Sequence, residues 1–377
     1  MRWLGLILFV SASLSLKAQD TLYARQIIND LTSEKFYGRG YLHNGLGKAA
    51  KYIQNELKAN GIAPLFDGNY FQPFFQTVNT FPKIEVTLNG KKLVPGLDYI
   101  PHPSSGPLKG RYPVYAKDSV TYASPRGELV FQLRKKLTYS VGNESRNKTI
   151  IELDKTRFKE LPEKAELEIK TKVLDKFKAN NVGGIIKGTS SDSIIIFSAH
   201  YDHLGGLGDH TWFPGANDNA SGVSVVLNLM KYYKAHPPKY TTVFIFFAGE
   251  EAGLLGSLYL SEHPPFPLKQ VKFMINLDLL GTGDDGIMVV NGAVYEKEFK
   301  RLHDLNDAKR LVYGVNKRGK AANSDHYWFS EKGVPAFFIY TLGGVTAYHD
   351  VKDVSATLPL TDYVDVCQLI LQFVDGF

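Results

Sequence analysis

Acidic and histidine side chains recur at short intervals between positions 193 and 281 of this 377-residue chain. They occur in the segments Ser198-Ala199-His200-Tyr201-Asp202-His203, Asn217-Asp218-Asn219, Gly249-Glu250-Glu251 and Asn276-Leu277-Asp278. Each segment follows an apolar run or opens a helical pattern. The side chains should therefore gather where strands end, and this layout is typical of a metal site on an α/β sheet.

The residue types present suit one kind of metal chemistry. Zinc is bound by histidine nitrogen and carboxylate oxygen, and two zinc ions about 3.5–4 Å apart need a shared carboxylate. A complete site needs two histidines, a bridging acid, two further acidic ligands and one free carboxylate that acts as a base. The sequence contains such a set.

His200 follows the apolar run 194–198, and Asp202 lies two positions later. Its carboxylate could accept the other ring proton of His200 and so fix the tautomer of that ring. A His-x-Asp pair can also be purely structural. Asp218 lies just before the helix predicted from Ala220, so it is either a bridging ligand or only a helix-capping acid.

Glu250 and Glu251 follow a strand too apolar to be exposed. Two adjacent carboxylates are costly there unless a positive charge lies nearby, although a solvated acidic loop is the alternative. Neighbouring side chains at a turn point in different directions, so one could bind metal while the other acts as a base. Asp278 repeats the pattern after the buried strand 271–277.

The last ligand must come from downstream, where His326 and His349 both qualify. His349 follows the strand predicted to end at Tyr340, and Tyr348 beside it could donate a hydrogen bond to a developing oxyanion. His326 lies near a predicted helix start, which suits a capping or substrate-facing role. The residues alone favour His349.

Together these motifs resemble peptidase family M28, the zinc aminopeptidases with their carboxypeptidase and glutaminyl cyclase relatives. The ordered motifs His-x-Asp, Asp-Asn-x-Ser-Gly, Gly-Glu-Glu, Asn-x-Asp, Ser-Asp-His and Tyr-His carry the resemblance. It is loose over residues 24–70 and close over residues 181–373. One departure is Leu279, where the family more often has methionine.

The resemblance implies a role for each site residue. One zinc would be held by His200, Asp218 and Asp278, and a second by Asp218, Glu251 and His349, so that Asp218 bridges them. Glu250 would be the general base and Tyr348 the oxyanion donor. The peptide bond between Asp218 and Asn219 would be cis. The residues expected to support the ligands are Asp202, Asn219, Asp325, His326 and Asp353.

The elements that would position this site alternate between strand and helix. Apolar runs predict buried strands at 194–198, 242–247, 271–277, 287–290 and 336–340. Helical spacing predicts helices at 20–29, 44–60, 220–233, 254–261, 295–306, 325–332 and 362–373. We therefore expect an α/β fold, a three-layer, mostly parallel mixed sheet with helices on both faces, as in this class of zinc peptidase.

Residues 81–164 differ in character, with prolines, glycines and short β-like runs. They predict a small β-rich insertion within a catalytic domain formed by residues 19–80 and 165–377. Asn89-Gly90 predicts a hairpin turn. Strands are also expected at 71–78, 83–88 and 165–173, and residues 180–188 are expected to form an edge strand.

Residues 1–18 have the charged start, apolar core and small-residue end of a secretory signal peptide, which predicts a periplasmic or extracellular protein without a membrane span. The net charge of +6 is spread along the chain without a basic-aromatic ladder, so we expect no nucleic-acid partner. The one cysteine, Cys367, is expected to be buried. The oligomeric state is not indicated.

The leading hypothesis is a secreted exopeptidase that hydrolyses the N-terminal bond of peptides, using water activated by two zinc ions with Glu250 as base. A glutaminyl cyclase with a single zinc is the alternative. A non-catalytic binding module on the same scaffold is a third hypothesis, but such modules are expected to lose ligands, and none is missing here.

Overall fold

The computed structural model describes residues 20–158 and 161–377, and the predicted signal peptide lies outside them. The helices are α1 Thr21–Thr32, α2 Gly45–Ala59, α3 Gly222–Ala235, α4 Leu255–Glu262, α5 Glu296–Lys309, α6 His326–Glu331 and α7 Tyr363–Asp375. Each overlaps a helix predicted from apolar spacing. Nowhere in the described chain is there a helix with the length and apolar character needed to cross a membrane.

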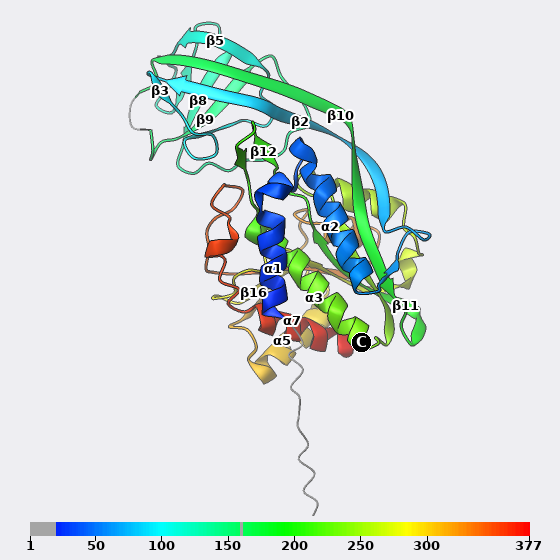
Figure 1. The fold of residues 1–377 in the computed structure, drawn as a ribbon. Coiled ribbons are helices and arrows are strands. Elements are labelled where there is room, and N and C mark those ends of the chain that lie inside the picture. The colour runs from blue at the N-terminus through cyan, green and yellow to red at the C-terminus, as the bar shows by residue number, and fades with distance from the viewer. Residues whose placement is uncertain (1–19, 159–160) are drawn as a thin grey trace, which may run out of the picture.

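One large mixed sheet organises most of the chain (Figure 1). Its strands run in the spatial order β13-β12-β2-β10-β14-β11-β15-β18-β16-β17. Their bounds are β2 Phe71–Leu88, β10 Lys164–Ile186, β11 Ser190–His200, β12 Gly206–Leu207, β13 Thr211–Trp212, β14 Tyr240–Phe247, β15 Val271–Leu277, β16 Ile287–Val290, β17 Val315–Lys317 and β18 Ala336–Thr341. Three short strands are added to this sheet: β1 Ala63–Pro64 and β5 Leu108–Pro113 pair with β10, and β3 Lys91–Lys92 pairs with β2.

Successive residues of a strand point to opposite faces, which explains the continuous apolar runs. Ile195 and Phe197 of β11 pack in one core with α1, α2, α3 and α7. Ile194 and Ile196 pack in a second core with Leu260 of α4 and other residues of the opposite face. The predicted three-layer arrangement, with helices on both faces, is confirmed.

The centre of the sheet is parallel, in the order β14, β11, β15 and β18. Flanking strands are antiparallel, with β10 against β14 and β16 against β18. Parallel strands end at the same edge of a sheet, so the residues that follow β11, β14 and β15 are brought together. The mostly parallel prediction therefore holds for the strands that position the site.

The β-rich region forms a second sheet in the order β4-β9-β8-β7-β6. Its strands are β4 Tyr99–Pro101, β6 Tyr115–Ala116, β7 Thr121–Ala123, β8 Leu129–Arg134 and β9 Thr149–Asp154. Its apolar side chains, which include Tyr99, Phe131 and Ile151, form a second hydrophobic core that Leu204, Leu207 and Phe213 of the main part of the chain also enter. Figure 1 shows it at the far end of β2 and β10, which extend out of the main sheet as a long antiparallel pair.

Two details differ from the sequence expectation. Residues 71–88 form one strand, and 164–186 form another, so positions 81 and 164 lie inside or at the start of continuous strands. The predicted edge strand at 180–188 is wrong, because β10 pairs with β14 on one side and β2 on the other. The β2–β3 hairpin at Asn89-Gly90 is confirmed.

Candidate metal centre

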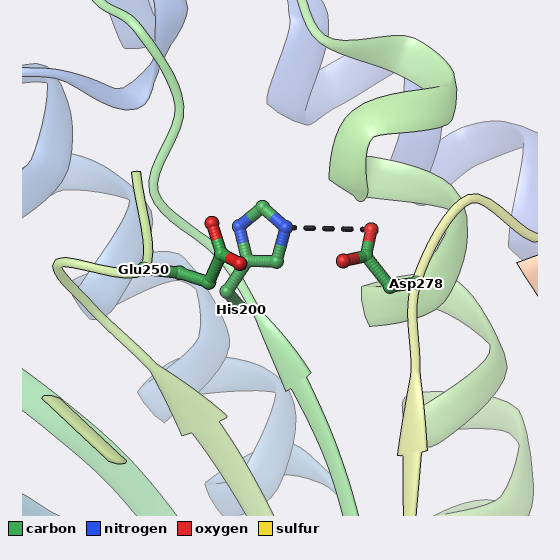
Figure 2. Close-up of side chains that lie close together, drawn as sticks. All are labelled: His200, Glu250 and Asp278. Carbon is green, nitrogen blue, oxygen red and sulfur yellow. Dashed lines mark ion pairs between the residues drawn. The ribbon is translucent and has the colours of Figure 1, made fainter. Parts of the chain in front are cut away.

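Acidic and imidazole side chains at the ends of three central strands lie close together. His200 is the last residue of β11, Glu250 follows β14, and Asp278 directly follows β15. One ligand atom from each of these residues lies within 4.8 Å of those from the other two. Figure 2 shows Glu250 and Asp278 on opposite sides of the His200 ring.

Asp218 links two groups of side chains through its two carboxylate oxygens. Its Oδ1 lies 3.3 Å from Nε2 of His200, which is also 3.4 Å from Oδ1 of Asp278. Its Oδ2 lies 3.1 Å from Nε2 of His349, which is 3.2 Å from Oε2 of Glu251. One carboxylate is therefore shared by two separate ligand groups, as expected for a bridging acid.

These spacings fit ligands of a tetrahedral zinc ion. Ligand atoms about 2.0–2.2 Å from a tetrahedral ion lie about 3.3 Å from each other. The four distances of 3.1–3.4 Å match this value, and Oδ1 of Asp278 has no hydrogen-bond donor within the described residues. The residues present therefore fit two divalent ions in the predicted sets.

Neighbouring groups fix the segment that carries Asp218. The Asp218–Asn219 peptide bond is cis, as the resemblance implied. The Asp353 carboxylate accepts hydrogen bonds from the Asn217 and Asp218 amides at 2.9–3.1 Å. Gly215 has φ +63°, and a Cβ there would lie 2.2 Å from the Asp218 carbonyl oxygen, so this position requires glycine.

Asn219 and Asp202 also support the ligands. The Asn219 side chain donates to the Leu277 carbonyl at 3.0 Å and accepts from the Leu279 amide at 3.3 Å, which ties the Asp218 segment to β15. The Asp202 carboxylate accepts from the amides of Glu250 and Glu251, both at 3.3 Å. It lies 3.7 Å from Nδ1 of His200, and the nearer acceptor for that nitrogen is the Asp202 carbonyl at 3.2 Å.

His203 belongs to the site, although the sequence analysis gave it no role. Its Nδ1 lies 2.7 Å from Oε1 of Glu251. This is a hydrogen-bond distance rather than the spacing of two ligands on one ion. We interpret His203 as the donor that orients Glu251, while the other oxygen of Glu251 faces His349. Its position three residues after His200, in the same segment, was the available signal.

Arg39 is a second residue that the sequence analysis did not single out. Its guanidinium is fully buried and donates to the carbonyls of Tyr201, Leu31, Pro214, Gly215 and Asp218 at 2.6–3.2 Å. Burial lowers the pKa of Arg39 to about 10, while nearby carboxylates, Asp218 foremost, oppose that change. Arg39 thus joins the N-terminal segment to the loop that carries the bridging acid.

Replacing Arg39 with methionine should lower the free energy of unfolding by at least about 3 kcal/mol, because several buried carbonyls would lose their donors. Urea denaturation of the metal-free protein measures this change. Arg111→Met is the control, since Arg111 is 82% exposed in its ion pair and its loss should change stability by no more than about 0.5 kcal/mol. Equal stability of the two variants would contradict the structural role of Arg39.

A buried chain of hydrogen bonds holds Asp278. Ser198 donates to Asn276 at 2.7 Å, Asn276 to Ser324 at 2.8 Å, and Ser324 to Oδ2 of Asp278 at 3.1 Å. The adjacent Asp325 is fully buried near His200, and burial raises its pKa to about 7. Ser324, which precedes α6, thus orients the Asp278 carboxylate, and Asn276 of β15 in turn orients Ser324.

His326 does not reach the ligand groups. It is fully buried at the start of α6, its ring lies 5.5 Å from that of Phe338, and burial lowers its pKa to about 4. His326 is thus enclosed by protein, whereas His349 lies at ligand spacing, and the supporting role expected of His326 stays a prediction. The two histidines differ in their environment more than in their sequence context.

Glu250 and Tyr348 have environments that suit the roles expected of them. Burial raises the pKa of Glu250 well above its usual range and outweighs the opposing charge of His200. The Tyr348 ring stacks on that of His349, with centroids 4.0 Å apart, and is 43% exposed. Burial and the site carboxylates raise the pKa of Tyr348, so its hydroxyl keeps a proton to donate. Both roles remain predictions.

Comparison with known proteins agrees with this geometry. The sequence model described as peptidase family M28 matches residues 181–374, more than half of the chain and all of the ligand residues above. The chain belongs to peptidase family M28. Aminopeptidase YwaD of Bacillus subtilis (strain 168) is 26% identical over 243 residues, which are 60% of this chain and 52% of that protein. The chain thus spans about half the length of the curated relatives it matches.

Solved structures of M28 proteins share the fold over nearly the whole chain. The Shewanella amazonensis SB2B peptidase M28 precursor has a TM-score of 0.72 at 16% identity, with 95% of this chain and 93% of that chain covered. The aminopeptidase from Aneurinibacillus sp. strain AM-1 has a TM-score of 0.65 at 19% identity, covering 95% and 94%. The similarity to these two structures therefore extends over the β-rich region as well as the main sheet.

Proposed function

We propose that this M28 protein is a zinc-dependent aminopeptidase that removes N-terminal residues from peptides with two zinc ions bound per chain. The position of Asp218 carries the proposal, because each of its oxygens lies at ligand spacing from a different imidazole. The names of relatives support the same activity, including an aminopeptidase of Bacillus subtilis and probable zinc metalloproteases. Bound zinc would lower the pKa of water and polarise the carbonyl of the substrate.

The charge of the site favours a substrate with a free amino group. Seven carboxyl groups gather here, namely Asp202, Asp218, Glu250, Glu251, Asp278, Asp325 and Asp353. Burial raises the pKa of Glu250, Asp278, Asp325 and Asp353 in the metal-free site, and bound divalent ions would favour their ionised forms. With all seven ionised, their negative charge exceeds the positive charge of two divalent ions and Arg39. The remaining negative charge would attract the ammonium group of a peptide N-terminus and disfavour a C-terminal carboxylate.

Glu250 and Tyr348 would act on different groups, Glu250 on the attacking water and the leaving amine, and Tyr348 on the oxygen of the scissile carbonyl. Glu250 takes a proton from the attacking water and passes it to the leaving amine. The Tyr348 hydroxyl, which remains protonated, donates to the oxygen of the scissile carbonyl as negative charge develops on it. His203, Asp202 and Asn219 keep the ligand side chains and the Glu250 segment in place throughout.

Peptides with free and acetylated N-termini, assayed with and without chelator, test the proposal. We expect only the free peptides to lose their first residue, chelator to stop the reaction, and zinc to restore it. Cleavage of acetylated peptides would contradict aminopeptidase activity. Formation of pyroglutamate from N-terminal glutamine by protein with one zinc would instead establish the glutaminyl cyclase.

We also propose that the protein is exported, on the basis of the apolar segment that precedes the described residues. Cell fractionation with N-terminal sequencing of the exported form tests this. We expect the mature chain to begin close to Gln19. Retention of the intact N-terminus in the cytoplasm would contradict export.

Zinc binding should release protons. Burial alone would lower the pKa of the two imidazoles, but Asp278 and Glu250 raise the pKa of His200 well above its usual range, and Glu251 and Asp218 raise that of His349 to about 11. Both rings are therefore protonated at pH 7 without metal, and zinc binds only the neutral ring.

Calorimetry at pH 7 in buffers of different ionisation enthalpy should detect about one proton released per imidazole. Since protons compete with zinc, the apparent zinc affinity should fall as pH decreases. The His349→Ala variant lacks one of the two imidazoles, so it should release about one proton fewer than the wild-type protein. Binding without proton release would contradict the assignment of the imidazoles as ligands.

A further inference from the structure

The β-rich region contacts the loop that carries Tyr348 and His349. Tyr139, between β8 and β9, donates its amide to the His349 carbonyl at 2.9 Å. Nδ1 of His349 lies 3.0 Å from the Tyr139 carbonyl oxygen, to which it can donate. One residue of the β-rich region thus fixes both the main chain and the ring of His349, and leaves Nε2 facing Asp218 and Glu251.

Lys136 attaches the same loop on both sides of His349. Its Nζ donates to the Thr346 carbonyl at 2.9 Å and lies 3.5 Å from the Asp350 carboxylate. Asp350 also accepts from the amide of Tyr348 at 3.4 Å. The contacts of Lys136 therefore bracket the two residues expected to act in catalysis.

The segment that makes these contacts is itself well anchored. The buried Tyr139 ring stacks on Phe213, with centroids 4.8 Å apart and planes 10° apart. By contrast, the loop it holds begins at Gly343 and Gly344, both with positive φ, and its residues 343–350 are exposed or half-buried, none of them buried. The contact therefore joins a loop without buried residues to Tyr139, a buried and stacked residue of the β-rich region.

We propose that the β-rich region is a working part of the metal centre, and that Lys136 is a positioning residue for His349. Through Lys136, the β-rich region fixes the position of the loop relative to the metal centre. Through the Tyr139 carbonyl, it fixes the tautomer of the His349 ring. Groups that hold the second nitrogen of a metal-binding histidine commonly change metal affinity or activity about 10–100-fold when altered. This inference rests on the proposed two-zinc site.

Lys136→Met removes the charge and the donor while keeping the length of the side chain. We expect one of two zinc equivalents to bind about tenfold more weakly in chelator competition, and kcat to fall about tenfold with KM within about twofold of the wild-type value. The unfolding midpoint of the metal-free protein should hardly change, because the Lys136 side chain is 48% exposed. Lys136→Arg should restore most of the zinc affinity.

Lys135→Met is the matched control. Lys135 and Lys136 both line a cavity of about 610 Å³ beside the loop, and in the described part of the chain Lys135 forms no ion pair. The inference is overturned if the Lys136→Met and Lys135→Met proteins bind zinc equally well, or if Lys136→Arg loses as much zinc affinity as Lys136→Met. It is also overturned if Lys136→Met destabilises the metal-free protein by as much free energy as it costs in zinc binding. Zinc alone is the probe, so the result holds even if no peptide is cleaved and the proposed activity fails.

Discussion

Glu250→Gln should reduce peptide hydrolysis by about 10²–10⁴-fold while the protein keeps both zinc ions. Glutamine has the size of glutamate but cannot take a proton from water. Glu250 lies within 4.8 Å of the ligand atoms of His200 and Asp278, close enough to reach a water molecule held among them. Steady-state kinetics and zinc analysis of the same preparation measure the two effects separately.

Glu262→Gln provides the control, because Glu262 is exposed at the end of α4 and should have wild-type activity. Turnover near the wild-type rate in Glu250→Gln would exclude Glu250 as the base. Loss of zinc from that variant would show that Glu250 is a ligand instead, and the general base would then have to be sought among the neighbouring carboxylates.

Asp218→Asn should have the second large effect, which is the loss of zinc as well as of activity. Among the described residues, the shared carboxylate is the one group at ligand spacing from both His200 and His349, and the amide carries no charge to balance two divalent ions. A bound metal contributes several kcal/mol to catalysis, so activity should fall at least about 10³-fold. Zinc analysis after dialysis and kinetics with added zinc measure the change.

Asp284→Asn, at an exposed loop position after β15, should retain both zinc ions and full activity. An Asp218→Asn protein with two tightly bound zinc ions and near wild-type kcat would show that the ions do not share this side chain. A comparison of metal-free unfolding midpoints separates loss of metal from loss of fold.

Much of the fold could be predicted from local patterns. The run at 194–198 is continuously apolar because Ile194 and Ile196 enter one core while Ile195 and Phe197 enter the other. Such a strand reads as buried from its composition alone. Residues 174–179 of β10 were harder to predict: Asp175, Lys176 and Lys178 are exposed and no regular apolar alternation marks a strand, and the main-chain pairing with β2 is what continues it.

The candidate site was predictable where residue type carries the chemistry. Carboxylates at the ends of apolar strands are costly without a cation, so Glu251 and Asp278 stood out. Arg39, Tyr139 and Lys136 did not, because they act through main-chain carbonyls or amides, or through an ordinary surface ion pair. Contacts of that kind leave no pattern in residue type or spacing.

The sequence by itself determined the order of the elements, the family and the residue types available as ligands at the strand ends, since strand burial and metal chemistry both depend on side-chain type. The tertiary structure decided which histidine completes the second group, and which residues hold it. His326 and His349 both follow plausible motifs, but only the folded chain places one against Phe338 and the other between Asp218 and Glu251. The physical reason is that a ligand group is defined by distances of about 3 Å between residues that can lie far apart in the chain, such as Asp218 and His349.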